Sequence, residues 1–155
     1  MTTAPIGAKL AQAIHLATAY HQGQVDKAGQ PYIQHPLRVM HAVAGETEKI
    51  VAVLHDTLED TAITLEEITS NFGTEVAEAI VALTKNKDED YFDFIRRVKR
   101  NAIATKVKIA DLQGNLDLSR LSVVTEKDQA RVSKYQQALV MLLEDGASLG
   151  DQPTF

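Results

Sequence analysis

The sequence contains no cysteine, and this absence limits the chemistry open to the chain. Without thiols there can be neither a disulfide framework nor a thiolate ligand for a metal ion. Any metal site must therefore use histidine nitrogen and carboxylate oxygen. Such a donor set suits Mn, Fe, Co, Ni or Zn better than the soft metals.

Long apolar runs and a basic surplus are also missing. The first residues lack a basic start followed by a sustained apolar run, so no signal peptide is predicted. No apolar stretch approaches the roughly 20 residues that span a bilayer, so we expect a cytoplasmic protein with no membrane partner. A net charge of -5 argues against nucleic acid as a partner, but it leaves a small nucleotide substrate open.

Basic residues are nevertheless concentrated in one short stretch of the chain. The stretch contains Arg96, Arg97, Lys99, Arg100, Lys106 and Lys108. A solvated helix face and a phosphate-facing surface account for this pattern equally well.

Apolar residues recur at helical spacing along most of the chain, and strand-length alternation is absent. This periodicity predicts an all-α fold, a compact bundle of roughly seven helices. We expect a single domain over residues 1–155, with a core from about 6 to 145 and a frayed C-terminal tail. Helices are predicted over 6–21, 34–44, a segment capped by Thr47 that carries His55, segments opened by Thr64 and Thr74, two within 91–116, and about 127–145.

The densest chemical signal is the string HDTLED, His55 to Asp60, at the end of an apolar run. On a continuous helix, His55 and Asp56 would lie about 100° apart and could both lean toward one cation. Glu59 and Asp60 would follow roughly 6 Å further along the axis, where they could serve the attacking water or the substrate. Acidic residues at a helix C-terminus oppose the helix dipole, and a bound cation would offset that cost.

Two further residues complete a set of four ligands. His35 precedes a proline at the start of a predicted helix, and Asp111 follows an apolar stretch in which a lone carboxylate would be costly to bury. Together, His35, His55, Asp56 and Asp111 offer nitrogen and oxygen to one divalent ion. Such an ion lowers the pKa of a bound water and polarises a phosphoryl oxygen. The sequence therefore predicts a metal-dependent phosphohydrolase.

The order of these motifs resembles the HD-domain hydrolases. The strings HQGQVDKAGQPYIQHP, VAVLHDTLEDT and VKIADLQGN are most similar to the hydrolase half of RelA/SpoT enzymes and to stand-alone small alarmone hydrolases. The resemblance spans roughly residues 8–145 and implies a helical bundle of the HD-domain type. It implies manganese at the four ligands, with Glu59 and Asp60 as a catalytic acidic pair. The implied reaction removes the 3′-pyrophosphate from guanosine tetra- or pentaphosphate.

The resemblance also implies a substrate pocket, with contacts from Lys27, Asn115, Arg131 and Tyr135. Three positions depart from the family pattern. Asp26 stands where arginine is usual, Leu112 where arginine or lysine is usual, and Gly114 where a bulkier residue is usual. A carboxylate close to a polyanionic substrate would repel it, so Asp26 either points away or marks a different substrate.

Two alternatives to an alarmone hydrolase stay open. The first is a metal-dependent phosphohydrolase for another nucleotide, which the residues Asp26 and Leu112 favour. The second is a non-catalytic HD module that binds a nucleotide and regulates a partner. Loss of a ligand or of the acidic pair would mark such a module, and neither is lost here. A cyclic-dinucleotide phosphodiesterase is disfavoured, because the glycine-tyrosine-proline signature of that subgroup is absent.

Overall fold

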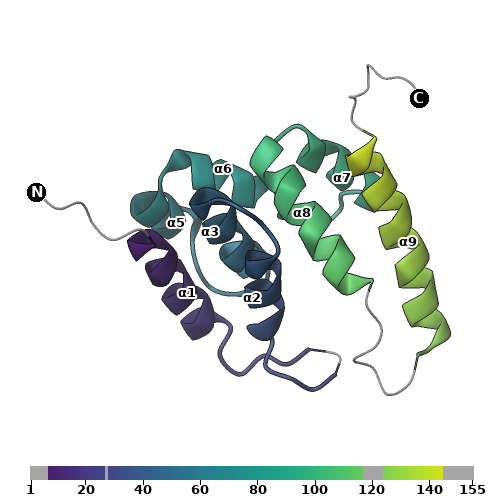
Figure 1. Ribbon diagram of the computed structural model, residues 1–155, viewed down its shortest axis with the longest axis horizontal. Coiled ribbons are helices and arrows are strands. Elements are labelled where there is room, and N and C mark those ends of the chain that lie inside the picture. The colour runs from purple at the N-terminus through teal and green to yellow at the C-terminus, as the bar shows by residue number, and fades with distance from the viewer. Residues whose placement is uncertain (1–6, 27, 117–123, 145–155) are drawn as a thin grey trace, which may run out of the picture.

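The computed structural model describes residues 7–26, 28–116 and 124–144, and this part of the chain forms nine helices and no β-strand (Figure 1). Within it, Val25 and Pro31 form an isolated antiparallel bridge. The all-α prediction is confirmed, whereas the tail predicted to be frayed lies outside the described residues. The helices are α1 (Ala8–Tyr20), α2 (Gln34–His41), α3 (Glu46–Leu54), α4 (Thr57–Asp60), α5 (Leu65–Phe72), α6 (Thr74–Ala82), α7 (Tyr91–Lys99), α8 (Ala102–Asn115) and α9 (Glu126–Leu143).

Capping and turn residues set several of the helix boundaries. The Thr64 side chain accepts a hydrogen bond from the Glu67 backbone N–H at the start of α5, as its spacing predicts. Gly73 separates α5 from α6 with a φ of 93°, a backbone conformation that favours glycine. The predicted cap at Thr47 is wrong, because Gly45 occupies the N-cap position of α3.

The predicted helix through His55 and Asp56 is interrupted at these two residues. His55 is the C-cap of α3, and Asp56 is the N-cap of the short helix α4. The Thr57 hydroxyl donates a hydrogen bond to the Leu54 carbonyl over 2.7 Å, which satisfies an acceptor at the end of α3. The break turns one predicted helix into two, so Glu59 and Asp60 belong to a different helix from the one that carries His55.

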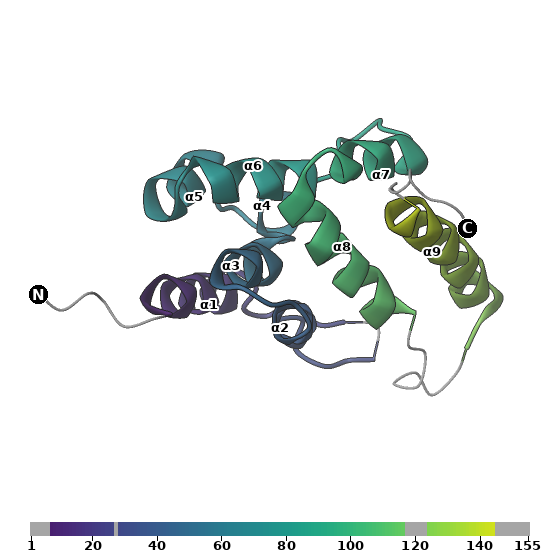
Figure 2. The same cartoon turned by 45° about the horizontal axis from the view of Figure 1, so that its top comes forward.

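Helix α3 lies at the centre of the core. Its residues Ile50–Leu54 are all buried, and it packs against α1, α2, α6 and α8. Helix α8 lies between α2 and α3 on one side and α7 and α9 on the other (Figure 2). Side chains that are far apart in the sequence therefore face one another where α2, α3 and α8 meet. None of the described helices combines the length and the apolar character that a bilayer crossing requires.

Candidate functional site

His55 is oriented by a hydrogen bond to its own helix. Its Nδ1 lies 2.6 Å from the Ala52 carbonyl oxygen, so Nδ1 donates a hydrogen bond there, and the neutral form of the ring has its lone pair on Nε2. The side chain is 2% exposed. Within the described chain, Nε2 has no hydrogen-bond partner, although carboxylates lie near it. A buried ring nitrogen held in this way is suited to a metal ligand.

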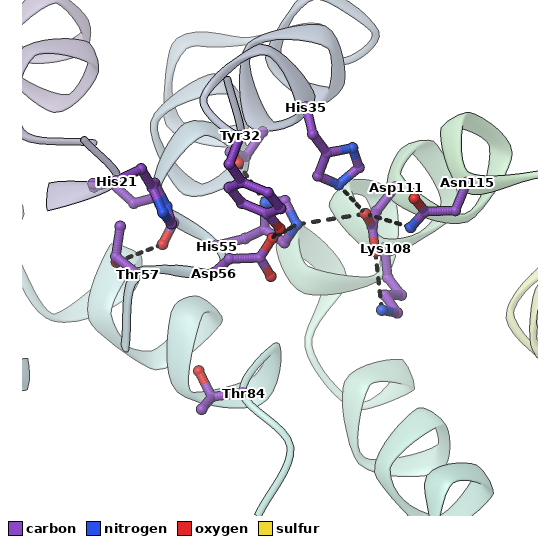
Figure 3. A network of polar contacts seen from close by, with 12 residues as sticks. His21, Tyr32, His35, His55, Asp56, Thr57, Thr84, Lys108, Asp111 and Asn115 are labelled. Atoms are coloured by element: carbon purple, nitrogen blue, oxygen red, sulfur yellow. Dashed lines mark hydrogen bonds and ion pairs between the residues drawn. The ribbon is translucent and has the colours of Figure 1, made fainter. Parts of the chain in front are cut away.

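His35 and Asp111 meet His55 at one point in the core (Figure 3). His35 stands in the first turn of α2, directly before Pro36, and its Nε2 lies 2.7 Å from Asp111 Oδ1. His55 Nε2 lies 3.5 Å from the same oxygen. All three residues are buried, and one ligand atom of each lies within 4.8 Å of the others. Helices α2 and α8 and the end of α3 thus bring together two imidazoles and one carboxylate.

Asp56 stands at the edge of this cluster. Its Oδ2 lies 3.2 Å from His55 Nε2 and accepts a hydrogen bond from the Tyr32 hydroxyl. Burial and the Asp56 carboxylate raise the pKa of Tyr32 well above its usual value, so the phenol stays protonated as a donor. Tyr32 carries no signal of its own in the sequence beyond its place in the string before His35. Only the structure shows that it orients Asp56.

The charges around Asp111 are balanced by its neighbours. Its Oδ2 lies 3.0 Å from the Lys108 ammonium, and its Oδ1 accepts a hydrogen bond from Asn115 over 3.1 Å. Burial alone would raise the pKa of Asp111, but Lys108 and the two imidazoles hold it well below its usual range. Burial would likewise lower the pKa of His55, but the Asp56 and Asp111 carboxylates raise it to about 9. Two buried imidazoles and a buried carboxylate converge here, and His55 Nε2 has no hydrogen-bond partner within the described residues, so this donor set fits a divalent metal ion.

The cluster borders a cavity of about 430 Å³. Three of the predicted substrate residues line this cavity, namely Asn115, Arg131 and Tyr135, whereas Lys27 lies outside the described residues. Glu59 also lines the cavity, but Asp60 is not among the lining residues. Partial burial and the neighbouring carboxylates of Asp60 and Asp56 raise the pKa of Glu59. A carboxyl group with a raised pKa at the cavity wall is suited to proton transfer.

A family model for the HD domain matches residues 13–145. This chain belongs to the HD-domain family. It is 35% identical to the mouse protein named guanosine-3′,5′-bis(diphosphate) 3′-pyrophosphohydrolase MESH1, and the match covers 83% of this chain and 79% of that protein. A solved structure titled as a metazoan orthologue of SpoT that hydrolyses ppGpp is also similar. Its TM-score is 0.72 at 25% identity, and the match covers 92% of this chain and 88% of that one.

Longer proteins contain a similar region. The chain is 33% identical to a Myxococcus xanthus GTP pyrophosphokinase and 34% identical to the Aquifex aeolicus protein named guanosine-3′,5′-bis(diphosphate) 3′-pyrophosphohydrolase. These matches cover 74% and 81% of the HD-domain chain. They cover only 17% and 20% of the two relatives. The HD-domain chain thus spans a fifth or less of the length of these relatives.

In this HD domain, the Asp26 side chain forms hydrogen bonds with the backbone of its own loop. Its Oδ1 accepts hydrogen bonds from the backbone N–H groups of Ala28 and Gln30, each over 2.9 Å. Aspartate commonly closes a turn in this way. Asp26 lines the cavity, but this oxygen is engaged with the loop backbone. The local bond explains why an aspartate suits the position without a direct contact to the substrate.

The other two departures from the family pattern differ in their surroundings. Leu112 is fully buried in the hydrophobic core of the HD domain, so a cation expected at this position is replaced by a packing residue. A Cβ atom added at Gly114 would meet no atom within 4 Å, so steric crowding does not explain why this position is a glycine.

The basic stretch between Arg96 and Lys108 has several roles. Arg97 pairs with Glu89 over 2.7 Å and donates hydrogen bonds to the backbone carbonyls of Val81 and Thr84. Arg96 pairs with Asp93 on the exposed side of α7. Of the six basic residues in the stretch, all of them described, Lys108 alone lines the cavity. The phosphate-facing interpretation therefore stays a prediction for Lys108 alone rather than for the whole stretch.

Proposed function

We propose that this HD domain is a metal-dependent phosphohydrolase that removes the 3′-pyrophosphate from guanosine tetra- or pentaphosphate. The observation that carries the proposal is the buried cluster of His35, His55 and Asp111 on the border of a cavity also lined by Lys108 and Arg131. Cationic donors next to a nitrogen and oxygen cluster suit a phosphorylated ligand. Relatives that carry the name of this reaction support the choice of substrate.

In this proposal, His35, His55, Asp56 and Asp111 hold one divalent ion, and the family resemblance favours manganese. A divalent ion held there would polarise a phosphoryl oxygen and lower the pKa of a bound water. The Ala52 carbonyl keeps His55 in the tautomer that presents Nε2 to the site. Asp56 is not part of the close group of ligand atoms formed by His35, His55 and Asp111. The hydrogen bond from the Tyr32 hydroxyl holds the Asp56 carboxylate toward that group.

The chain's own residues would handle the protons and the nucleotide. Hydrolysis consumes one water and breaks the bond between the 3′-oxygen and its phosphorus, so the tetraphosphate gives guanosine 5′-diphosphate and pyrophosphate. Glu59 is proposed to accept a proton from the attacking water, and the departing 3′-oxygen takes up a proton. Asp60 supports Glu59 by raising its pKa. The nucleotide would be held by Lys27, Asn115, Arg131 and Tyr135.

The proposal includes a single catalytic domain and a cytoplasmic location. The family match over residues 13–145 supports the first, because it covers most of the chain. The second is the location that the sequence predicts.

Metal analysis combined with a nucleotide panel tests the proposed function. The protein is loaded with manganese and incubated with guanosine tetraphosphate, guanosine pentaphosphate, and nucleotides that carry a single 3′-phosphate. Release of pyrophosphate from the tetraphosphate is the expected result. Turnover confined to another nucleotide would instead support the alternative substrate. Stoichiometric binding without turnover of any nucleotide would support the non-catalytic module.

A further inference from the structure

The hydroxyl of Tyr91 is shielded from water at the cavity wall, and it has no hydrogen-bond partner among the described residues. Buried polar groups almost always have a partner, because leaving one unpaired costs free energy. Tyr91 lines the same cavity as Lys108, Arg131 and Tyr135. A ligand in this cavity would therefore supply the acceptor that the described part of the chain does not.

Neighbouring side chains hold the Tyr91 ring in place at the first residue of α7. The centroid of its ring lies 6.0 Å from that of Phe94 and 6.1 Å from that of Tyr135. The Lys134 ammonium lies 4.6 Å from the ring centroid. Aromatic contacts and a cation over the ring restrict its movement. The hydroxyl is therefore a preorganised group, and a ligand would gain its hydrogen bond without ordering a flexible side chain.

The polar groups near Tyr91 indicate which ligand atoms would meet it. Lys108 and Arg131, which line the same cavity as Tyr91, can only donate hydrogen bonds, so together the three side chains suit a group that only accepts, such as phosphate. Lys108 Nζ lies 5.3 Å from the centroid of the Phe94 ring and 3.0 Å from Asp111 Oδ2. Lys108 thus stands between the aromatic wall and the His35, His55 and Asp111 cluster. A phosphate at the aromatic wall would lie on the other side of Lys108 from a bond cleaved at that cluster.

We infer that the Tyr91 hydroxyl donates a hydrogen bond to the 5′-phosphate group of the bound nucleotide. The inference rests on the proposed function, because it assumes that the 3′-pyrophosphate lies at the His35, His55 and Asp111 cluster. A neutral donor contributes recognition at this position without changing the charge of the cavity. Tyr91 is thus a specificity residue that contacts the substrate away from the reacting atoms.

The stability of the ligand-free protein distinguishes this role from a structural one. Tyr91→Phe removes a buried hydroxyl that has no hydrogen-bond partner among the residues the structure describes, so the variant should unfold at a temperature roughly 2–4 °C higher than wild type. Tyr20→Phe is the matched control, because the Tyr20 hydroxyl donates a hydrogen bond to Glu67 over 2.7 Å. This control should show no such gain. A lower melting temperature for Tyr91→Phe would mean that the hydroxyl supports the fold, and it would overturn the inference.

Kinetics with two substrates locate the contact. For guanosine tetraphosphate, Tyr91→Phe should raise KM roughly tenfold or more and leave kcat within about twofold. For guanosine 3′-diphosphate, which lacks 5′-phosphates, the KM of variant and wild type should be equal. An equal rise in KM for both substrates would place the contact elsewhere on the nucleotide. Tyr20→Phe should change neither constant.

Binding of guanosine 5′-diphosphate to the metal-free protein separates this inference from the proposed function. Calorimetry should show weaker binding to Tyr91→Phe than to wild type by a similar factor. If wild type binds this ligand more tightly than the variant but hydrolyses no tetraphosphate, the proposed function fails and the contact stands. If wild type hydrolyses the tetraphosphate and the substitution changes neither KM nor binding, the contact fails and the function stands. Absence of both binding and turnover in wild type overturns both.

Discussion

At the scale of single residues, one backbone carbonyl distinguishes His55 from the other histidines of the chain. Nδ1 of His55 is bonded to the Ala52 carbonyl, and the buried Nε2 is left for the site. His15 and His41, by contrast, are exposed on the surfaces of α1 and α2. The same residue type thus has a different chemistry at each position, because hydrogen bonding and burial decide which nitrogen is available.

His55→Ala should abolish both metal binding and phosphohydrolase activity. The substitution removes one of the two imidazoles that meet at Asp111, and the remaining ligands cannot enclose the ion. Elemental analysis of the purified protein measures the metal content directly. His15→Ala is the control and should retain metal at the level of wild type. Stoichiometric metal in His55→Ala would show that the ligand set is wrong.

Glu59→Gln should retain the metal but lose about 10²- to 10⁴-fold in kcat, the usual contribution of a general acid or base. Glu59 lines the cavity, and its raised pKa comes from partial burial and from nearby carboxylates. Steady-state kinetics and metal analysis on the same sample separate the two roles. Glu66→Gln, on the exposed side of α5, should leave both values unchanged. Metal loss from Glu59→Gln would make Glu59 a ligand instead.

At the scale of helices, a single side chain holds the segment that joins α6 to α7. Arg97, on α7, donates hydrogen bonds to the carbonyls of Val81 and Thr84 and pairs with Glu89. Arg97 and Glu89 are 26% and 14% exposed, so solvent screens this pair only in part. The pair positions the segment that precedes Tyr91. Arg97 belongs to the basic stretch for which a phosphate-facing role was considered, but in the structure it anchors a loop.

Glu89→Gln should lower the free energy of unfolding by about 1 kcal/mol at neutral pH, because it removes the charge from a hydrogen-bonded ion pair. Hydrogen bonds from Arg97 lower the pKa of Glu89 to about 2. Since this folded-state pKa lies below the unfolded value, the contribution is complete above pH 4.5 and is lost as the pH falls toward 2. Urea unfolding at pH 7 and near pH 3 should show the difference from wild type shrinking in acid. A difference that is constant with pH would mean that the ion pair contributes nothing. Asp88→Asn, at an exposed position, is the control.

At the scale of the whole molecule, the site joins three segments of the core. His35 comes from α2, His55 from the end of α3 and Asp111 from α8, and these helices pack against one another. An ion bound by all three segments would be lost on unfolding, because the unfolded chain does not keep the ligands together. Metal binding should therefore be linked to the stability of the entire fold.

Manganese at about 100 times its dissociation constant should stabilise the wild-type protein by about 2.7 kcal/mol, which corresponds to a rise in Tm of roughly 5–10 °C. Thermal unfolding with and without the ion measures this shift. His15→Ala should show the full shift, whereas His55→Ala should show almost none. A shift of equal size in His55→Ala would place the stabilising metal elsewhere on the chain.

Local patterns in the sequence predicted much of the fold. The apolar spacing predicted the helices, Thr64 marked the start of α5, and Gly73 marked its end. These features depend on residues within a turn or two of one another, so they can be read along the chain. The break between His55 and Asp56 could not be read in this way. No proline or glycine marks it, and only the packed structure shows α3 ending at Leu54.

The sequence by itself determined which kinds of segment form helices, and it grouped His35, His55 and Asp111 as candidate ligands of one ion. Tertiary structure decided how close they lie, that Tyr32 orients Asp56, and that Asp26 bonds to its own loop. It also decided that Leu112 packs in the core, that Arg97 anchors a loop, and that Tyr91 lines a cavity with its hydroxyl unpaired within the described part of the chain. The physical reason is that helical periodicity is a short-range property. Burial and hydrogen-bond partners, by contrast, depend on which distant segments pack together.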